Sequence, residues 1–124
     1  MNKRDPKLTA LMFNECINAR DLDGLTALMT DDHVFIDRED GRYQGKDRMS
    51  RGWSEFFNAF PEYRNTFVRV QSREDLVVAL GYAEWAAGGE RDHVIWTATI
   101  RDDLVAEWRV LSDTEANREL LGLT

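Results

Sequence analysis

The N-terminal half of the chain carries apolar residues at helical spacing. Over residues 8–20 they recur every three or four positions, which predicts a helix with one buried face. Asp5 and Pro6 mark its start, because an aspartate caps free N–H groups and proline is preset for a first helical turn. A second, shorter helix is predicted under an Asp21 cap, and the polar run 30–32 ends it.

A strand and a third helix are predicted next. Residues 33–37 have the pattern of a first strand, and the charged, glycine-containing run 38–45 that of a loop. The third helix covers residues 46–60 and stops at Pro61. Its large apolar residues share one wide, aromatic face. They are Met49, Trp53, Phe56, Phe57 and Phe60.

Beyond Pro61 the pattern changes from helical to strand-like. Four runs are joined by short polar connections, which predicts an antiparallel meander. The runs cover residues 63–71, 76–87, 93–101 and 104–111. Asp113 is predicted to cap a last helical turn through Leu121, with Gly122 as its stop. The whole chain, residues 1–124, is therefore predicted to be one α+β domain.

Charge and cysteine content exclude several classes of function. The net charge is -7 and the charges are interspersed, which disfavours nucleic acid and anionic membranes. Because Cys16 has no second cysteine to pair with, a reducing, cytoplasmic location is expected. His33 and His93 lack partners at metal-ligand spacing, so no metal and no cofactor are expected. Neither a signal-like stretch nor a long apolar run is present.

Several short segments resemble one known superfamily. They are residues 18–25, 27–29, 31–37, 43–46, 100–109, 113 and 120–122. With their order of helix, short helix, strand, long helix and meander, they resemble the NTF2-like superfamily, which includes ketosteroid isomerases and SnoaL-like polyketide cyclases. The resemblance implies a cone in which a curved, mainly antiparallel sheet packs its concave face against three helices from the N-terminal half. It is specific for fold and not for activity, because this scaffold hosts isomerases, dehydratases, hydrolases, cyclases and non-enzymes.

The resemblance implies one acid–base residue without its partners. Asp37 matches the position where ketosteroid isomerases hold their general base. Phe13 and Trp96 stand where those enzymes hold two oxyanion donors, a tyrosine and a protonated aspartate, so both of the family's donor groups are missing. One such donor typically lowers the barrier by roughly 3 to 4 kcal/mol. Steroid isomerisation is therefore disfavoured.

Three residues are candidates for acid–base chemistry. If Asp37 lies in an apolar wall, desolvation raises its pKa and makes it an effective proton acceptor and donor. Alternatively, it pairs with Arg38 or Arg42 or caps the loop. His33 shares its strand face and could orient it or shuttle a proton, although a partly exposed histidine is the plainer interpretation. Asp113, at a strand-to-helix corner, is the third candidate, although helix capping explains it fully.

Strand alternation predicts a pocket on the inner face of the sheet, because side chains two positions apart share a face. The small residues Ala79, Gly81 and Ala83 would face inward and leave room for a ligand. The bulky residues between them would face outward and need a cover, which predicts a homodimer in agreement with family habit. The predicted lining is Phe13, Phe35, Trp53, Phe57, Ala83, Trp96, Ala98, Trp108 and Val110. Such a wall suits a small, flat or cyclic hydrophobic molecule.

Two functions follow from these observations. The first is a cofactor-independent isomerase, cyclase or dehydratase that acts on a small hydrophobic carbonyl compound, with Asp37 as general acid–base. The second is a non-catalytic module of the same fold that binds a small molecule or forms a dimer. The retained Asp37 favours the first function, and the missing donors at positions 13 and 96 favour the second.

Overall fold

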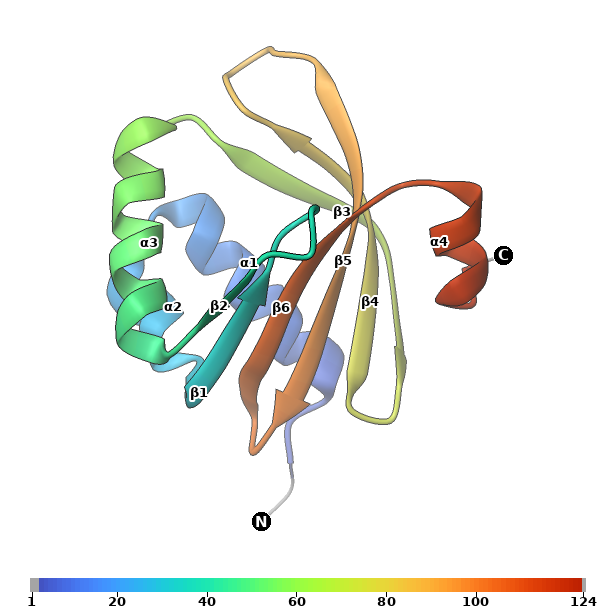
Figure 1. The fold of residues 1–124 in the computed structure, drawn as a ribbon, viewed down its shortest axis with the longest axis horizontal. Coiled ribbons are helices and arrows are strands. Elements are labelled where there is room, and N and C mark those ends of the chain that lie inside the picture. Colours follow the sequence, from blue (N-terminus) through green and yellow to red (C-terminus); the bar gives the residue numbers. More distant parts are fainter. Residues whose placement is uncertain (1–2, 124) are drawn as a thin grey trace.

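Residues 3–123, which the computed structural model describes, form four helices and six strands. The helices are α1 (Pro6–Ala19), α2 (Leu22–Ala27), α3 (Lys46–Ala59) and α4 (Glu115–Leu120). The strands are β1 (Met29–Ile36), β2 (Arg42–Gln44), β3 (Arg64–Arg73), β4 (Leu76–Glu84), β5 (Arg91–Arg101) and β6 (Leu104–Ser112). Figure 1 shows α1, α2 and α3 on one side of a curved sheet and α4 on the other. This is the predicted α+β cone.

The predicted starts of the first two helices are confirmed. The Asp5 carboxylate accepts the N–H of Lys7, and the Asp21 carboxylate accepts the N–H of Gly24, each at 3.0 Å. Each bond satisfies a donor that the first helical turn leaves free. No helix within residues 3–123 has the length and apolar character needed to cross a membrane.

The first strand begins earlier than predicted, and the predicted loop contains a strand. Residues 30–32 belong to β1, because Met29 pairs with Val105 of β6 and Asp32 forms an ion pair with Arg101. These partners lie far away in sequence, so a local polar run does not reveal them. The predicted loop 38–45 instead folds back on β1, with β2 pairing antiparallel to it.

The sheet has the order β2-β1-β6-β5-β4-β3. Strands β3 to β6 form the predicted antiparallel meander, and β1 joins β6 in parallel. The register of β3 shifts between Phe67 and Arg69. At this bulge the backbones of β3 and β4 approach so closely that a Cβ on Gly81 would lie 1.9 Å from the Thr66 carbonyl oxygen. Glycine is therefore required at position 81.

Two apolar clusters lie on opposite faces of the sheet. Ala79 and Ala83 belong to the large inner cluster beneath the helices, as alternation predicts. Val78 belongs to an outer cluster, where Leu121 and Leu123 from the C-terminal segment pack against the sheet. Val78 and Leu80 thus have a cover within the same chain and need no second subunit to bury them. The homodimer stays a prediction.

Candidate functional site

A cavity of about 850 Å³ lies between α3, the inner face of the sheet and the turn that joins β1 to β2. Helix packing explains why it is there. The helix α1 packs across β3, β4, β5 and β6, whereas α3 packs mainly against β1 and β2 at one side of the sheet. The sheet in front of α3 is therefore left partly uncovered. A cavity of this size can enclose a drug-sized molecule.

Aromatic and aliphatic side chains form the walls of the cavity, and charged side chains ring its mouth. Six of the predicted residues line it. They are Phe35, Trp53, Ala83, Trp96, Trp108 and Val110. The charged residues at the mouth include Glu39, Arg48, Arg51 and Glu55, all of them exposed. A ligand would thus meet an apolar interior behind a polar rim.

Phe13, Phe57 and Ala98 do not line the cavity, which corrects their predicted place. Phe13 is fully buried, and its ring centroid lies 4.6 Å from that of Trp108. Ala98, which is paired opposite the same tryptophan, is 2% exposed and belongs to the core. The ring of Phe57 packs against Trp53 at 5.7 Å and belongs to the core. The helical and strand patterns predict that these residues face the interior, but they do not predict how far the helices fill the space above the sheet.

Asp37 lies at the mouth of the cavity and closes the β1–β2 turn. Its Oδ1 accepts the N–H groups of Glu39 and Gly41 at 2.9 and 2.8 Å, and its Oδ2 accepts the Tyr43 hydroxyl at 3.1 Å. These hydrogen bonds, with that from Gly41 the strongest cause, hold the pKa of Asp37 below its usual value. The predicted rise of this pKa by desolvation is therefore wrong. The contacts of Asp37 are those of a loop cap, which was the predicted alternative.

His33 lies in the core and not in the lining of the cavity. Its side chain is fully buried, and Nδ1 lies 2.6 Å from the Val105 carbonyl oxygen. A carbonyl only accepts, so the ring proton is on Nδ1 and Nε2 is left as an acceptor with no partner among residues 3–123. Burial lowers the pKa of His33, which keeps the ring neutral. Neither the predicted proton shuttle nor a partly exposed histidine fits this position.

Asp113 is engaged elsewhere. Both its oxygens accept hydrogen bonds from the Arg118 guanidinium, at 2.6 and 2.9 Å, and these bonds lower the pKa of Asp113. The N-cap of α4 is Thr114, whose hydroxyl accepts the N–H of Asn117, so the predicted cap is off by one residue. Within residues 3–123, no three His, Cys, Asp or Glu side chains gather closely enough to hold a metal ion.

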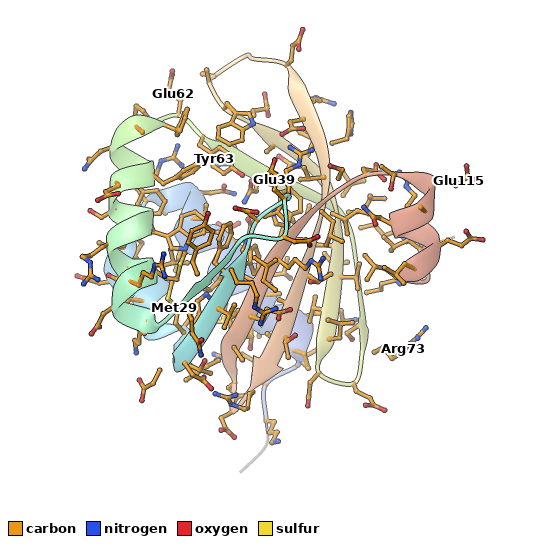
Figure 2. The ribbon with its side chains drawn as sticks, viewed as in Figure 1. Met29, Glu39, Glu62, Tyr63, Arg73 and Glu115 are labelled. Atoms are coloured by element: carbon orange, nitrogen blue, oxygen red, sulfur yellow. The ribbon has the colours of Figure 1, made fainter. Side chains whose placement is uncertain are left out.

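Tyr63 and Asn65 form a polar end of the cavity that the sequence analysis did not identify. Both residues line the cavity, and their side chains are 9% and 2% exposed. The Tyr63 ring lies between Phe56 and Trp85, at 4.8 and 5.0 Å, and burial raises its pKa, so the phenol stays neutral. Figure 2 shows Tyr63 near the turn that carries Glu39. A tyrosine and an asparagine two positions apart in the predicted strand 63–71 were the available signal.

An ion pair joins two sides of the cavity mouth. The Arg38 guanidinium, on the β1–β2 turn, donates to the Asp92 carboxylate of β5 at 2.7 Å. The same carboxylate oxygen accepts the Trp85 Nε1–H at 3.3 Å. All three residues line the cavity. The charges nearest the polar end are thus already paired with each other.

Sequence comparison identifies the family. Residues 10–108 match the family model of the SnoaL-like domain. The chain belongs to the SnoaL-like domain family. No curated protein matches this SnoaL-like chain in sequence.

Solved structures share the fold of this SnoaL-like domain. An uncharacterised cystatin-fold protein from Novosphingobium aromaticivorans is 18% identical with a TM-score of 0.79, over 87% of this chain and 98% of that one. TerC, co-crystallised with polyporic acid, is 19% identical with a TM-score of 0.75, over 95% and 99%. An LEH-like epoxide hydrolase from M. tuberculosis is 15% identical with a TM-score of 0.74, over 95% and 88%. At these identities the similarity concerns the fold alone.

Proposed function

We propose that this SnoaL-like domain binds a small, largely apolar, cyclic molecule in the cavity beneath α3. The observation that supports this most is a cavity of about 850 Å³ walled by Trp53, Trp96 and Trp108, with neutral polar groups at one end. Flat aromatic walls gain most from a flat or cyclic guest. TerC, which has the same fold, was co-crystallised with polyporic acid.

Binding is preferred to catalysis because the candidate proton carriers are poorly placed for proton transfer. A general base works best when its pKa lies near the working pH. Asp37 has a lowered pKa and accepts three hydrogen bonds. His33 and Asp113 lie outside the cavity lining. What remains at the polar end is a neutral phenol and an amide, which suit recognition.

A cavity-filling substitution tests this proposal. Ala83→Phe places a ring in the cavity, so we expect at least a tenfold weaker binding of benzophenone and polyporic acid, measured by calorimetry and tryptophan fluorescence. Leu80→Phe, on the outer face of the same strand, is the matched control and should leave binding unchanged. Native mass spectrometry of protein from its own host should detect a retained small molecule. Equal binding by both variants would contradict the proposal.

Proton transfer by Asp37 is a second candidate function, favoured by one observation: this carboxylate lines the cavity mouth. In this function, Asp37 takes a proton from the carbon next to the carbonyl group of a small hydrophobic ketone and returns it to the resulting enolate, without a cofactor. Deuterium exchange of 2-tetralone in heavy water, followed by NMR, tests it. Asp37→Asn should reduce exchange to the buffer rate, whereas Asp40→Asn in the same turn should not. Equal rates for wild type and Asp37→Asn would exclude this function.

The homodimer and the cytoplasmic location are further proposals. The C-terminal segment covers part of the outer face, which reduces the apolar area left for a partner chain. Light scattering on the full chain, at several concentrations, tests the dimer: a constant monomer mass would contradict it. Fractionation of the host's cells tests the location.

A further inference from the structure

We infer that Tyr63 selects the ligand of this cavity by donating its hydroxyl proton to a neutral carbonyl oxygen on the ligand. The assignment rests on the proposed function and adds the chemical class of the ligand. Two tyrosines, Tyr43 and Tyr63, line the cavity. The Tyr43 hydroxyl donates to Asp37 Oδ2 at 3.1 Å, so its proton is already in use. The Tyr63 hydroxyl has no acceptor in the part of the chain that the structure describes.

The Tyr63 hydroxyl lies on the side of its ring that faces the cavity. Burial is the largest cause that raises the pKa of this phenol, and the charge of Asp92 adds to it. The charge of Arg38 and a hydrogen bond from the Asn65 amide act in the opposite direction. All three of these neighbours line the cavity. The Tyr63 side chain is 9% exposed, and its oxygen is not among the buried, unpartnered atoms of residues 3–123.

The hydrogen bond with Asn65 decides what the hydroxyl can offer to a ligand. Because this bond favours the phenolate and so acts to lower the pKa of Tyr63, the amide is its donor and the phenol oxygen its acceptor. Asn65 Nδ2 also donates to Asn14 Oδ1 at 3.1 Å, which fixes the position of the amide. A neutral phenol carries one proton of its own, and here that proton stays unused. The hydroxyl therefore lacks an acceptor.

A neutral carbonyl oxygen is the acceptor that fits this donor best. It accepts without bringing a proton, whereas a ligand hydroxyl would bring a donor that must find a second acceptor. Arg38 and Asp92, the charges nearest the phenol, form an ion pair at 2.7 Å and leave no unpaired cation for an anionic ligand. A carboxylate placed beside them would lose its hydration without gaining a counter-ion. Aromatic ketones combine this acceptor with a flat apolar body.

Two probes of similar shape measure this hydrogen bond. Benzophenone has the acceptor and diphenylmethane lacks it, so the ratio of their Kd values reports on the carbonyl group. Tyr63→Phe keeps a ring between Phe56 and Trp85 and removes the hydroxyl. We expect the preference for benzophenone to fall by about five- to tenfold in this variant, measured by competition titration. Tyr43→Phe is the matched control, because its hydroxyl already donates to Asp37, and the preference should persist.

Infrared spectroscopy of bound, isotope-labelled benzophenone gives a readout that a change in packing does not move. A hydrogen bond to the carbonyl oxygen lowers its stretching frequency. The band should therefore lie below its position in hexane when benzophenone is bound to wild type, a measurement that needs no variant. It should return toward the hexane position in Tyr63→Phe but not in Tyr43→Phe. Diphenylacetate, which carries a carboxylate, should bind wild type about tenfold more weakly than benzophenone.

The outcomes distinguish the role of Tyr63 from the proposed function. A wild-type band at the hexane position, or an unchanged preference and band in Tyr63→Phe, would overturn the role of Tyr63 and leave the binding function standing. Diphenylacetate that binds as tightly as benzophenone would overturn the neutral class of the ligand. No binding of any probe, of polyporic acid or of a retained native molecule would overturn the binding function and the role of Tyr63 with it.

Discussion

The inner face of the sheet is packed solid at one end and hollow at the other, although the two ends carry similar residues. At one end α1 lies across four strands, and Phe13, Ile17 and Ala98 are packed with almost no exposed surface. At the other end α3 stays at the edge formed by β1 and β2, and Phe35, Trp53 and Val110 border a cavity. Both ends are aromatic and aliphatic. The position of the covering helix, more than residue type, decides which end is solid.

The comparison implies a division of roles between the two ends. Side chains of the solid end make contacts on all sides, so truncating them leaves a new void. Side chains that border the cavity already have empty space on one side, so truncation removes fewer contacts. Stability should therefore depend mainly on the solid end, and ligand binding mainly on the hollow end.

The largest expected effect is at the solid end. Phe13→Ala should lower the free energy of unfolding by about 3 to 5 kcal/mol, because this ring is fully buried and packs against Trp108. Urea denaturation measures it. Leu8→Ala, at a half-exposed position on the same helix, is the control and should change stability by less than about 0.5 kcal/mol. If Phe13→Ala lowered the free energy of unfolding by less than about 1 kcal/mol, this end of the inner face would not be tightly packed.

A matched truncation at the hollow end should weaken ligand binding strongly and lower stability only a little. Phe35→Ala should cost only about 1 to 2 kcal/mol of stability, because Phe35 is half-buried beside the cavity. It should weaken benzophenone binding by about tenfold, since an aromatic wall is lost. The same urea and calorimetry experiments apply. If this variant were as unstable as Phe13→Ala, the two ends would not differ as described.

Buried His33 should make the solid end sensitive to pH. Its folded-state pKa is lowered, so the unfolded chain takes up a proton first as the pH falls below about 6.5. Stability from this residue is complete above that pH and decreases toward the folded-state pKa, by up to about 1.4 kcal/mol per pH unit. Urea denaturation at several pH values should show this slope. The slope of stability against pH should flatten in His33→Asn and persist in His93→Asn. Equal slopes in wild type and His33→Asn would contradict the prediction.

The smallest effect is expected at the turn beside the cavity. The pKa of Asp37 is lowered by its hydrogen bonds, so its contribution to stability is present above the unfolded-state value of about 3.9 and is lost as the pH falls through the folded-state value. Asp37→Asn should thus lower the melting temperature at pH 7 by less than about 3 °C. Scanning calorimetry at pH 3 should find the two proteins closer together. A constant difference at both pH values would show that the charge is not responsible.

The elements that were predicted correctly are those with local signals. The face of α3 follows from the spacing of Met49, Trp53 and Phe57, all buried, and the meander follows from strand-like runs between polar turns. The start of β1 was missed because its pairing with β6 connects residues that are distant in sequence. Local patterns report which face a residue uses. They do not report which partner it meets.

For the candidate site as well, the sequence predicted which face a residue uses but not which partners it meets. Phe35, Trp96 and Val110 were placed on the correct face by alternation, whereas the depth of Phe13 depends on the course of α1 over the sheet. The pKa of Asp37 depends on a turn that returns the N–H of Gly41 to its carboxylate. Such folding back has no signature in the spacing of polar residues, so the sequence left both a desolvated carboxylate with a raised pKa and a loop cap open.

The contact between Gly81 and the Thr66 carbonyl limits how the cavity can be redesigned for another guest. The strands β3 and β4 meet there backbone to backbone, so any side chain would force them apart. Ala83, on the same face of β4, has empty space in front of it. A combinatorial library should therefore vary position 83 and keep glycine at 81, where diversity would yield chains unable to close their sheet.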